Sequence, residues 1–149
     1  MVRFVIVLVM TAFIDLYVKF IVMNKMVEGE SIPIWPGVFH LTYIQNPGAA
    51  FGMLAGKTWF FVGITALVLV GMAVSYRWIN QAGPLYHWAL GLVAGGAVGN
   101  LVDRIRYTKV IDFLDFRVWP VFNLADTAIC IGVGLILLDA FREFRREKG

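Results

Sequence analysis

The chain has 149 residues, of which 60% are hydrophobic and 15% charged, and its formal net charge is +3. Soluble domains are about 45–50% apolar, so this composition argues against a soluble protein and indicates one integral membrane domain, residues 1–149. The basic residues are dispersed outside the C-terminus, so the sequence shows no basic face for nucleic acid.

Four apolar runs are each long enough to cross a bilayer core of about 30 Å, which takes roughly 20 helical residues. They cover residues 4–23, 58–76, 84–102 and 118–138. The first run carries Asp15 and Lys19 and has no small-x-small cleavage pattern, so we interpret it as a retained span. Tryptophans near the run ends fit an interfacial aromatic belt. These are Trp59, Trp78, Trp88 and Trp119.

Four spans put both termini on the same side of the membrane, but a count of basic residues does not identify that side. Six fall on each side, and Lys19 lies inside the first span. The dense basic cluster in residues 142–148 favours a cytoplasmic location for both termini.

Two segments outside the apolar runs are rich in β-forming residues. One is 38–45 (VFHLTYIQ), which is followed by a turn at 46–48 (NPG), and the other is 110–119. Two such segments on one membrane face predict a small sheet.

Small residues recur every four positions in the third run, at Gly91, Gly95 and Gly99. Such a stripe lets another helix approach closely. The stripe ends in Asn100, Asp103 and Arg104, which packing does not explain; an interfacial ion cluster is the alternative to a site. Asp15 and Lys19, four residues apart, share a helix face as either a self-neutralising pair or support for a site.

Two carboxylates near the last run are the strongest candidates for chemistry. Asp112 precedes the run, and Asp126 lies eight residues past its start, at about 12 Å along a helix. A carboxylate at the centre of a membrane helix costs about 2.5–3.5 kcal/mol, so it requires a partner or a role. Asn123 shares the face of Asp126, whereas we expect Asp115 in an exposed loop without a role.

Other hydrolytic chemistries find little support. Cys130 is the only cysteine and has no histidine in its run, and Ser31 and Ser75 have no base nearby. His40 and His87 are far apart, so no metal-ligand cluster is visible, and we interpret both as structural. Two neighbouring carboxyls can share one proton, so that one activates water while the other donates a hydrogen bond to a carbonyl. The remaining chemistry is peptide hydrolysis without a metal or cofactor.

Four polar motifs, in this order, resemble those of the bacterial lipoprotein signal peptidases, the type II signal peptidases. They are Asp15 with Lys19; residues 46–52 (NPGAAFG); residues 99–104 (GNLVDR) with 110–113 (VIDF); and residues 122–126 (FNLAD). The resemblance covers about residues 13–136. One departure is Thr108-Lys109, where many members have glycine before the Val-x-Asp-Phe sequence.

The resemblance implies an aspartic endopeptidase of the bacterial inner membrane, with cytoplasmic termini and an active site toward the periplasmic face. It implies an all-α membrane fold of four transmembrane helices, a small extracytoplasmic β-sheet and a short, mobile periplasmic helix that covers the site. The implied substrates are prolipoproteins, cleaved before a lipobox cysteine that already carries a diacylglyceryl group. Cyclic peptide antibiotics of the globomycin type are the implied inhibitors.

Motif by motif, the resemblance makes Asp112 and Asp126 the catalytic pair. It implies orienting roles for Asn46, Asn100, Arg104 and Asn123, and supporting roles for Asp15, Lys19 and Asp103. We expect Asp112, on a β-prone loop, to be the more mobile acid, and the pair to be completed only when substrate closes this region.

Two alternatives belong to other classes. A small proton-coupled transporter or channel subunit would use Asp15, Asp103 and Asp126 as a relay, but it predicts acids spread over the membrane depth and an internal repeat. The sequence has no repeat, and the acids gather at one side of the four-span arrangement. A presenilin-type protease would need a Gly-x-Gly-Asp motif, which precedes neither Asp112 nor Asp126.

Overall fold

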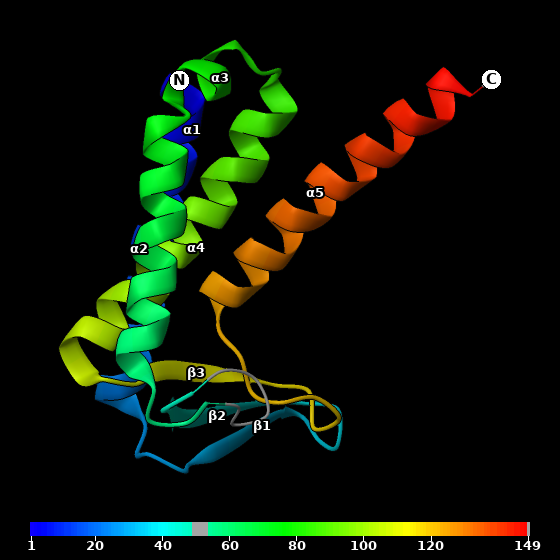
Figure 1. The fold of residues 1–149 in the computed structure, drawn as a ribbon. Helices are drawn as coiled ribbons and strands as arrows, with labels where there is room; N and C mark the ends of the chain where they lie inside the picture. Colours follow the sequence, from blue (N-terminus) through cyan, green and yellow to red (C-terminus); the bar gives the residue numbers. More distant parts are fainter. Residues whose placement is uncertain (49–53, 149) are drawn as a thin grey trace.

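The computed structural model describes residues 1–48 and 54–148, so residues 49–52 of the second motif lie outside the described chain. The sheet lies at one end of the helices, and both termini lie at the other end (Figure 1). The elements are α1 (Val2–Lys25), β1 (Ser31–Trp35), β2 (Phe39–Asn46), α2 (Thr58–Val74), α3 (Tyr76–Gln81), α4 (Pro84–Tyr107), β3 (Val110–Asp115) and α5 (Leu124–Glu147).

Three helices, α1, α4 and α5, are long and apolar enough to cross a membrane. Each has 24 residues, or about 36 Å at 1.5 Å per residue. Many large apolar side chains on α1 and α5 are exposed, as expected of lipid-facing helices. They include Val5, Ile6, Phe13, Ile14, Phe20, Ile131, Val133 and Leu137.

The second run differs from the prediction of four equally long spans. Its helix α2 has 17 residues and is apolar but shorter than the other three. Ser75 is both the C-cap of α2 and the N-cap of α3, so the chain continues directly into a second, short helix.

The fourth run also begins later than predicted, because residues 118–123 are not helical. Pro120 has no backbone N–H, and Phe122 exchanges backbone hydrogen bonds with Leu114 of β3. Asn123 then starts α5 through a capping box: its side chain accepts from the N–H of Asp126, whose carboxylate accepts from the N–H of Asn123. Asp126 is therefore the third residue of the helix, and its predicted depth of about 12 Å is wrong.

The three strands form one antiparallel sheet in the order β1-β2-β3. The predicted pairing of the two β-prone segments is confirmed, with Ile44 opposite Asp112 and Asn46 opposite Val110. An apolar cluster attaches the sheet to the end of α1; it contains Val22, Met26, Tyr43, Ile111 and Phe113. The short helix expected beside the sheet is not found in residues 1–48 and 54–148, since α3 lies at the end of the termini (Figure 1).

The glycine stripe of α4 packs against α1, as predicted. A Cβ added at Gly95 would lie 2.6 Å from both the Leu8 carbonyl oxygen and the Thr11 Cβ, and one at Gly91 would lie 2.7 Å from the Val7 Cβ. These glycines let the α1 and α4 backbones approach closely enough to bring their polar residues into contact.

Gly95→Ala should therefore lower the free energy of unfolding by about 1–3 kcal/mol, because the new methyl group meets the α1 backbone. Thermal unfolding in detergent micelles measures the change. Gly134→Ala is the matched control: nothing lies within 4 Å of its added Cβ, so its midpoint should stay the same or rise slightly. Equal midpoints for the two variants would contradict the packing role.

Candidate active site

Asp112 and Asp126 lie on different elements and are connected through the side chain of Asn123. Asn123 Nδ2 donates to Asp112 Oδ1 at 2.7 Å, and Asn123 Oδ1 accepts from the backbone N–H of Asp126 at 2.9 Å. Asp112 is 2% exposed within β3, and Asn123 is fully buried. Within the described chain, no direct hydrogen bond joins the two carboxyl groups, so one amide bridges them.

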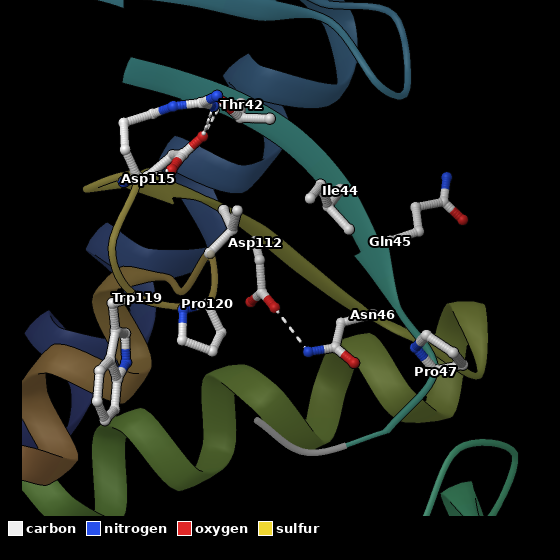
Figure 2. A pocket seen from close by; sticks show the side chains of 11 residues that line it. Thr42, Ile44, Gln45, Asn46, Pro47, Asp112, Asp115, Trp119 and Pro120 are labelled. Atoms are coloured by element: carbon white, nitrogen blue, oxygen red, sulfur yellow. Dashed lines mark hydrogen bonds and ion pairs between the residues drawn. The ribbon is translucent and has the colours of Figure 1, made fainter. Parts of the chain in front are cut away.

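Two further asparagines hold one carboxyl group each. Asn46 Nδ2, at the end of β2, donates to Asp112 Oδ2 at 2.9 Å (Figure 2). The Asn46 amide is fixed in turn, because its Oδ1 accepts from the Gly48 N–H. Asn100 Nδ2, from α4, donates to Asp126 Oδ1 at 2.7 Å. The structure thus brings the three asparagines of three separate motifs around the two acids.

The buried ammonium group of Lys19 sets the orientation of Asn100. Lys19 Nζ lies 2.7 Å from Asp15 Oδ2, 2.8 Å from Asp103 Oδ2 and 2.9 Å from Asn100 Oδ1. An ammonium group has three hydrogens and no acceptor, so these oxygens match its full capacity. Because the Asn100 oxygen faces Lys19, its Nδ2 is directed to Asp126.

Asp15 and Asp103 connect this cluster to the elements that carry the two acids. Asp15 Oδ1 accepts from the Ala125 N–H in the first turn of α5 at 2.8 Å, and Asp103 Oδ2 accepts from the Ile111 N–H of β3 at 3.1 Å. Asp15 and Lys19 are therefore more than a self-neutralising pair. Asp103 is 1% exposed, so a solvated interfacial ion cluster at this position is ruled out.

Arg104 is half-buried and lies one helical turn beyond Asn100. Its Nη1 donates to the backbone carbonyl of Asn100 at 3.4 Å. Its guanidinium group lies 4.9 Å from the centre of the Phe61 ring of α2, a cation–π distance. Arg104 lines a cavity that also contains Asp112 and Asp126, and it is the one cationic residue among the described residues that line this cavity.

Burial raises the pKa of Asp112 to about 7, and the charge of Asp126 acts in the same direction. The hydrogen bonds from Asn46 and Asn123 and the charge of Lys19 oppose this rise but do not cancel it. Asp112 is therefore protonated over much of the range below neutral pH.

Asp115 was expected in an exposed loop without a role, and this prediction is wrong. It ends β3 and is only 4% exposed. Thr42 Oγ1 donates to its Oδ2 at 2.7 Å, and Arg117 Nη1 lies 2.9 Å from the same oxygen. Burial raises the pKa of Asp115, but the bonds from Thr42 and Arg117 outweigh this and hold the pKa below its usual value. Strand alternation could not have revealed this, because Val110 and Asp112, of the opposite parity to Ile111 and Phe113, are buried too.

Two cavities meet at Asp112. The larger, about 980 Å³, lies among α2, α4 and α5, has mainly apolar walls and contains both acids. The smaller, about 530 Å³, lies over β2 and β3 and has several polar walls (Figure 2). Residues common to both are Asn46, Asp112, Trp119, Pro120 and Val121. Within the described chain, no three histidine, cysteine or acidic side chains are grouped to hold a metal ion.

The family model described as Signal peptidase (SPase) II matches residues 6–142. The chain belongs to the signal peptidase II family. A lipoprotein signal peptidase of Pelotomaculum thermopropionicum is 49% identical over 147 residues, covering 96% of this chain and 97% of the relative. A lipoprotein signal peptidase of Halothermothrix orenii is 49% identical, covering 93% and 94%.

Solved structures agree with this membership. One, described as a bacterial membrane enzyme at 2.3 Å resolution, has a TM-score of 0.89 and 31% identity, covering 95% of this chain and 88% of its own. Another, at 1.9 Å, has a TM-score of 0.83 and 32% identity, covering 92% and 91%. This signal peptidase II homologue is thus a membrane-embedded member of a lipoprotein-processing peptidase family, which leaves the transporter and presenilin-type alternatives without support.

Lys19→Met should lower the free energy of unfolding by about 3–5 kcal/mol, because it leaves two buried carboxyl groups without their counter-charge. Thermal unfolding in micelles measures the loss. Lys25→Met, in the exposed last turn of the same helix, should change stability by no more than about 0.5 kcal/mol. A Lys19 variant as stable as the Lys25 variant would contradict the central position of this ammonium group.

Proposed function

We propose that this signal peptidase II homologue is an aspartic endopeptidase that cleaves diacylglyceryl-modified prolipoproteins just before the lipidated lipobox cysteine. The observation that carries the proposal is the placement of Asp112 and Asp126, bridged by Asn123, where a mainly apolar cavity meets a smaller cavity lined partly by polar and charged side chains. This geometry supports attack on a peptide bond whose two sides differ strongly in polarity.

In the proposed mechanism the pair holds one proton, on Asp112. Protonated Asp112 donates a hydrogen bond to the scissile carbonyl, while Asp126 accepts a proton from the attacking water. The water oxygen bonds to the carbonyl carbon, the carbonyl oxygen takes the Asp112 proton, and the proton taken by Asp126 passes to the leaving amine as the C–N bond breaks. The Asp112 proton then returns from the collapsing intermediate, which restores the starting state.

The surrounding residues have positioning roles in this proposal. Asn46 and Asn123 orient Asp112, and Asn100 orients Asp126. Arg104, which lines the larger cavity, orients the substrate. Lys19, Asp15 and Asp103 support the site by fixing Asn100, the start of α5 and the backbone of β3.

The position of Asp126 in the first turn of α5 supports chemistry at the membrane interface, near the sheet, rather than deep in the bilayer. The acyl chains of the substrate then stay in the apolar cavity. We infer four membrane passages within one domain, residues 1–149, with α2 as the shortest, cytoplasmic termini and a sheet on the periplasmic face of the bacterial inner membrane. Cyclic peptide antibiotics of the globomycin type would compete for the apolar cavity.

The direct test is incubation of the purified protein with a diacylglyceryl prolipoprotein and with its unlipidated form. Only the lipidated precursor should be cleaved. Asp112→Asn and Asp126→Asn should each lower the cleavage rate by about 10²–10⁴-fold or more, because an amide can neither take nor give the required proton. Gel shift with mass spectrometry of the products measures rate and cleavage position.

Asp139→Asn is the matched control, because Asp139 lies outside both cavities and should leave the rate unchanged. Each variant should keep the wild-type free energy of unfolding within about 1 kcal/mol, which would show that the loss of activity is not caused by unfolding. Normal processing by either active-site variant would remove the catalytic pair from the proposal, and equal cleavage of both precursors would remove the lipid requirement.

The pKa of Asp112 predicts the pH dependence of cleavage. Raising the pH through about 7 removes the proton from Asp112, so kcat/KM should fall about tenfold per pH unit above that value. Asn46→Ala removes a hydrogen bond that lowers this pKa, so it should move the alkaline limb to higher pH. Gln45→Ala, at a neighbouring position without a bond to Asp112, should not move it. If the alkaline limb of the pH profile moved to lower pH in Asn46→Ala, this would contradict the assignment of the limb to Asp112.

A further inference from the structure

The smaller cavity contains a polar group that the proposed catalytic cycle does not use. On its floor, Asp115 accepts from Thr42 and from both the backbone and the side chain of Arg117. Arg117 takes a left-handed backbone conformation, φ 66°, which the bond from its N–H to Asp115 Oδ1 stabilises. This arrangement holds one arginine side chain at the wall of the cavity.

The accessible charge of this group is positive, although one acid and one base form it. Asp115 is buried and both of its oxygens are occupied, whereas the Arg117 side chain is 48% exposed. Among the described residues, its only side-chain bond is from Nη1 to Asp115, which leaves its other side-chain N–H groups for a ligand. A molecule in the cavity therefore meets the guanidinium group rather than the carboxylate.

The position of the cavity identifies the part of the substrate that reaches it. Lipid and signal peptide are apolar and belong with the larger cavity among the helices, whereas the chain after the cysteine is polar and leaves toward water. The smaller cavity is lined by β2, β3 and the segment after β3, and it shares Asp112 with the larger one. The sheet lies at the end of the helices opposite to the termini (Figure 1). Asp115 is three residues from Asp112, roughly 10 Å along a strand, which corresponds to about three residues of an extended substrate.

Resting on the proposed function, we propose that Arg117 is a specificity-determining residue that favours prolipoproteins with acidic residues in the short segment following the lipidated cysteine. Asp115 and Thr42 position the guanidinium group for this contact. A guanidinium group pairs well with a carboxylate and repels an ammonium group.

The test uses three synthetic diacylglyceryl precursors that differ only in the second and third residues after the cysteine: Asp-Asp, the near-isosteric Asn-Asn, and Lys-Lys. Wild-type kcat/KM should fall in that order, with roughly two- to fivefold between Asp-Asp and Asn-Asn, as expected of a half-exposed ion pair. The difference should shrink at high salt. Arg117→Gln should remove the Asp-Asp preference, Arg117→Lys should retain part of it, and Arg117→Glu should reverse the order.

Arg106→Gln is the control for net charge: Arg106 is exposed near the end of α4 and lines neither cavity, so this variant should keep the preference. Cleavage of the Asn-Asn precursor by each variant shows that it is folded and active. Equal wild-type rates on all three precursors, a preference for Lys-Lys, or equal effects of the Arg106 and Arg117 variants would each overturn the proposal. Failure of wild-type protein to cleave any precursor would instead contradict the proposed function itself.

Discussion

The buried ammonium group of Lys19 is the interaction on which the rest of the site depends. A charge at 1% exposure must be neutralised, and here two carboxyls and one amide oxygen surround it. The ion cluster itself is weak evidence for net stability, since a buried pair loses much of its attraction to desolvation. Its main effect is on geometry: it leaves few alternative arrangements for α1, α4 and the start of α5, because any other arrangement would leave a buried charge unpaired.

The effect of Lys19 reaches the proposed catalytic acids through hydrogen bonds of fixed direction. An amide donates from one end and accepts at the other, so a cation at the Asn100 oxygen determines what its nitrogen can bind. That nitrogen reaches Asp126 at 2.7 Å, and the same oxygen also accepts from Asn123, which holds Asp112. Each acid is thus positioned by neutral amides, which orient the carboxyl group by donating hydrogen bonds and, at Asp112, favour its ionised form.

Most of the site was predictable, because it is built from short polar motifs in apolar surroundings. Asn100, Asp103, Asn123 and Asp126 stood out for the cost of polar groups in a membrane. The exact contacts were not predictable: Lys19 and Asn100 are 81 residues apart in the chain, and only the close approach permitted by the α4 glycines joins them.

The errors have local physical causes. An apolar count extended the last helix back to residue 118, although Asn123 and Asp126 carry a capping box three residues after a proline. Hydropathy likewise does not detect the junction of α2 and α3 at Ser75, because the apolar run extends across it to residue 76. Asp115 was placed in an exposed loop, although it ends a β-prone segment and is held there by Thr42 and Arg117.

The position of Asp112 bears on the expectation that this acid moves when substrate completes the catalytic pair. It was expected on a loop that shifts, but it pairs with Ile44 within the edge strand β3, so moving its backbone would break the β2–β3 hydrogen bonds. Any adjustment therefore falls to the side chains and to the substrate. Asn123 connects the two acids without a direct bond between them. A water held between the carboxyls would complete the pair, and the strand and the helix cap would stay in place during the reaction.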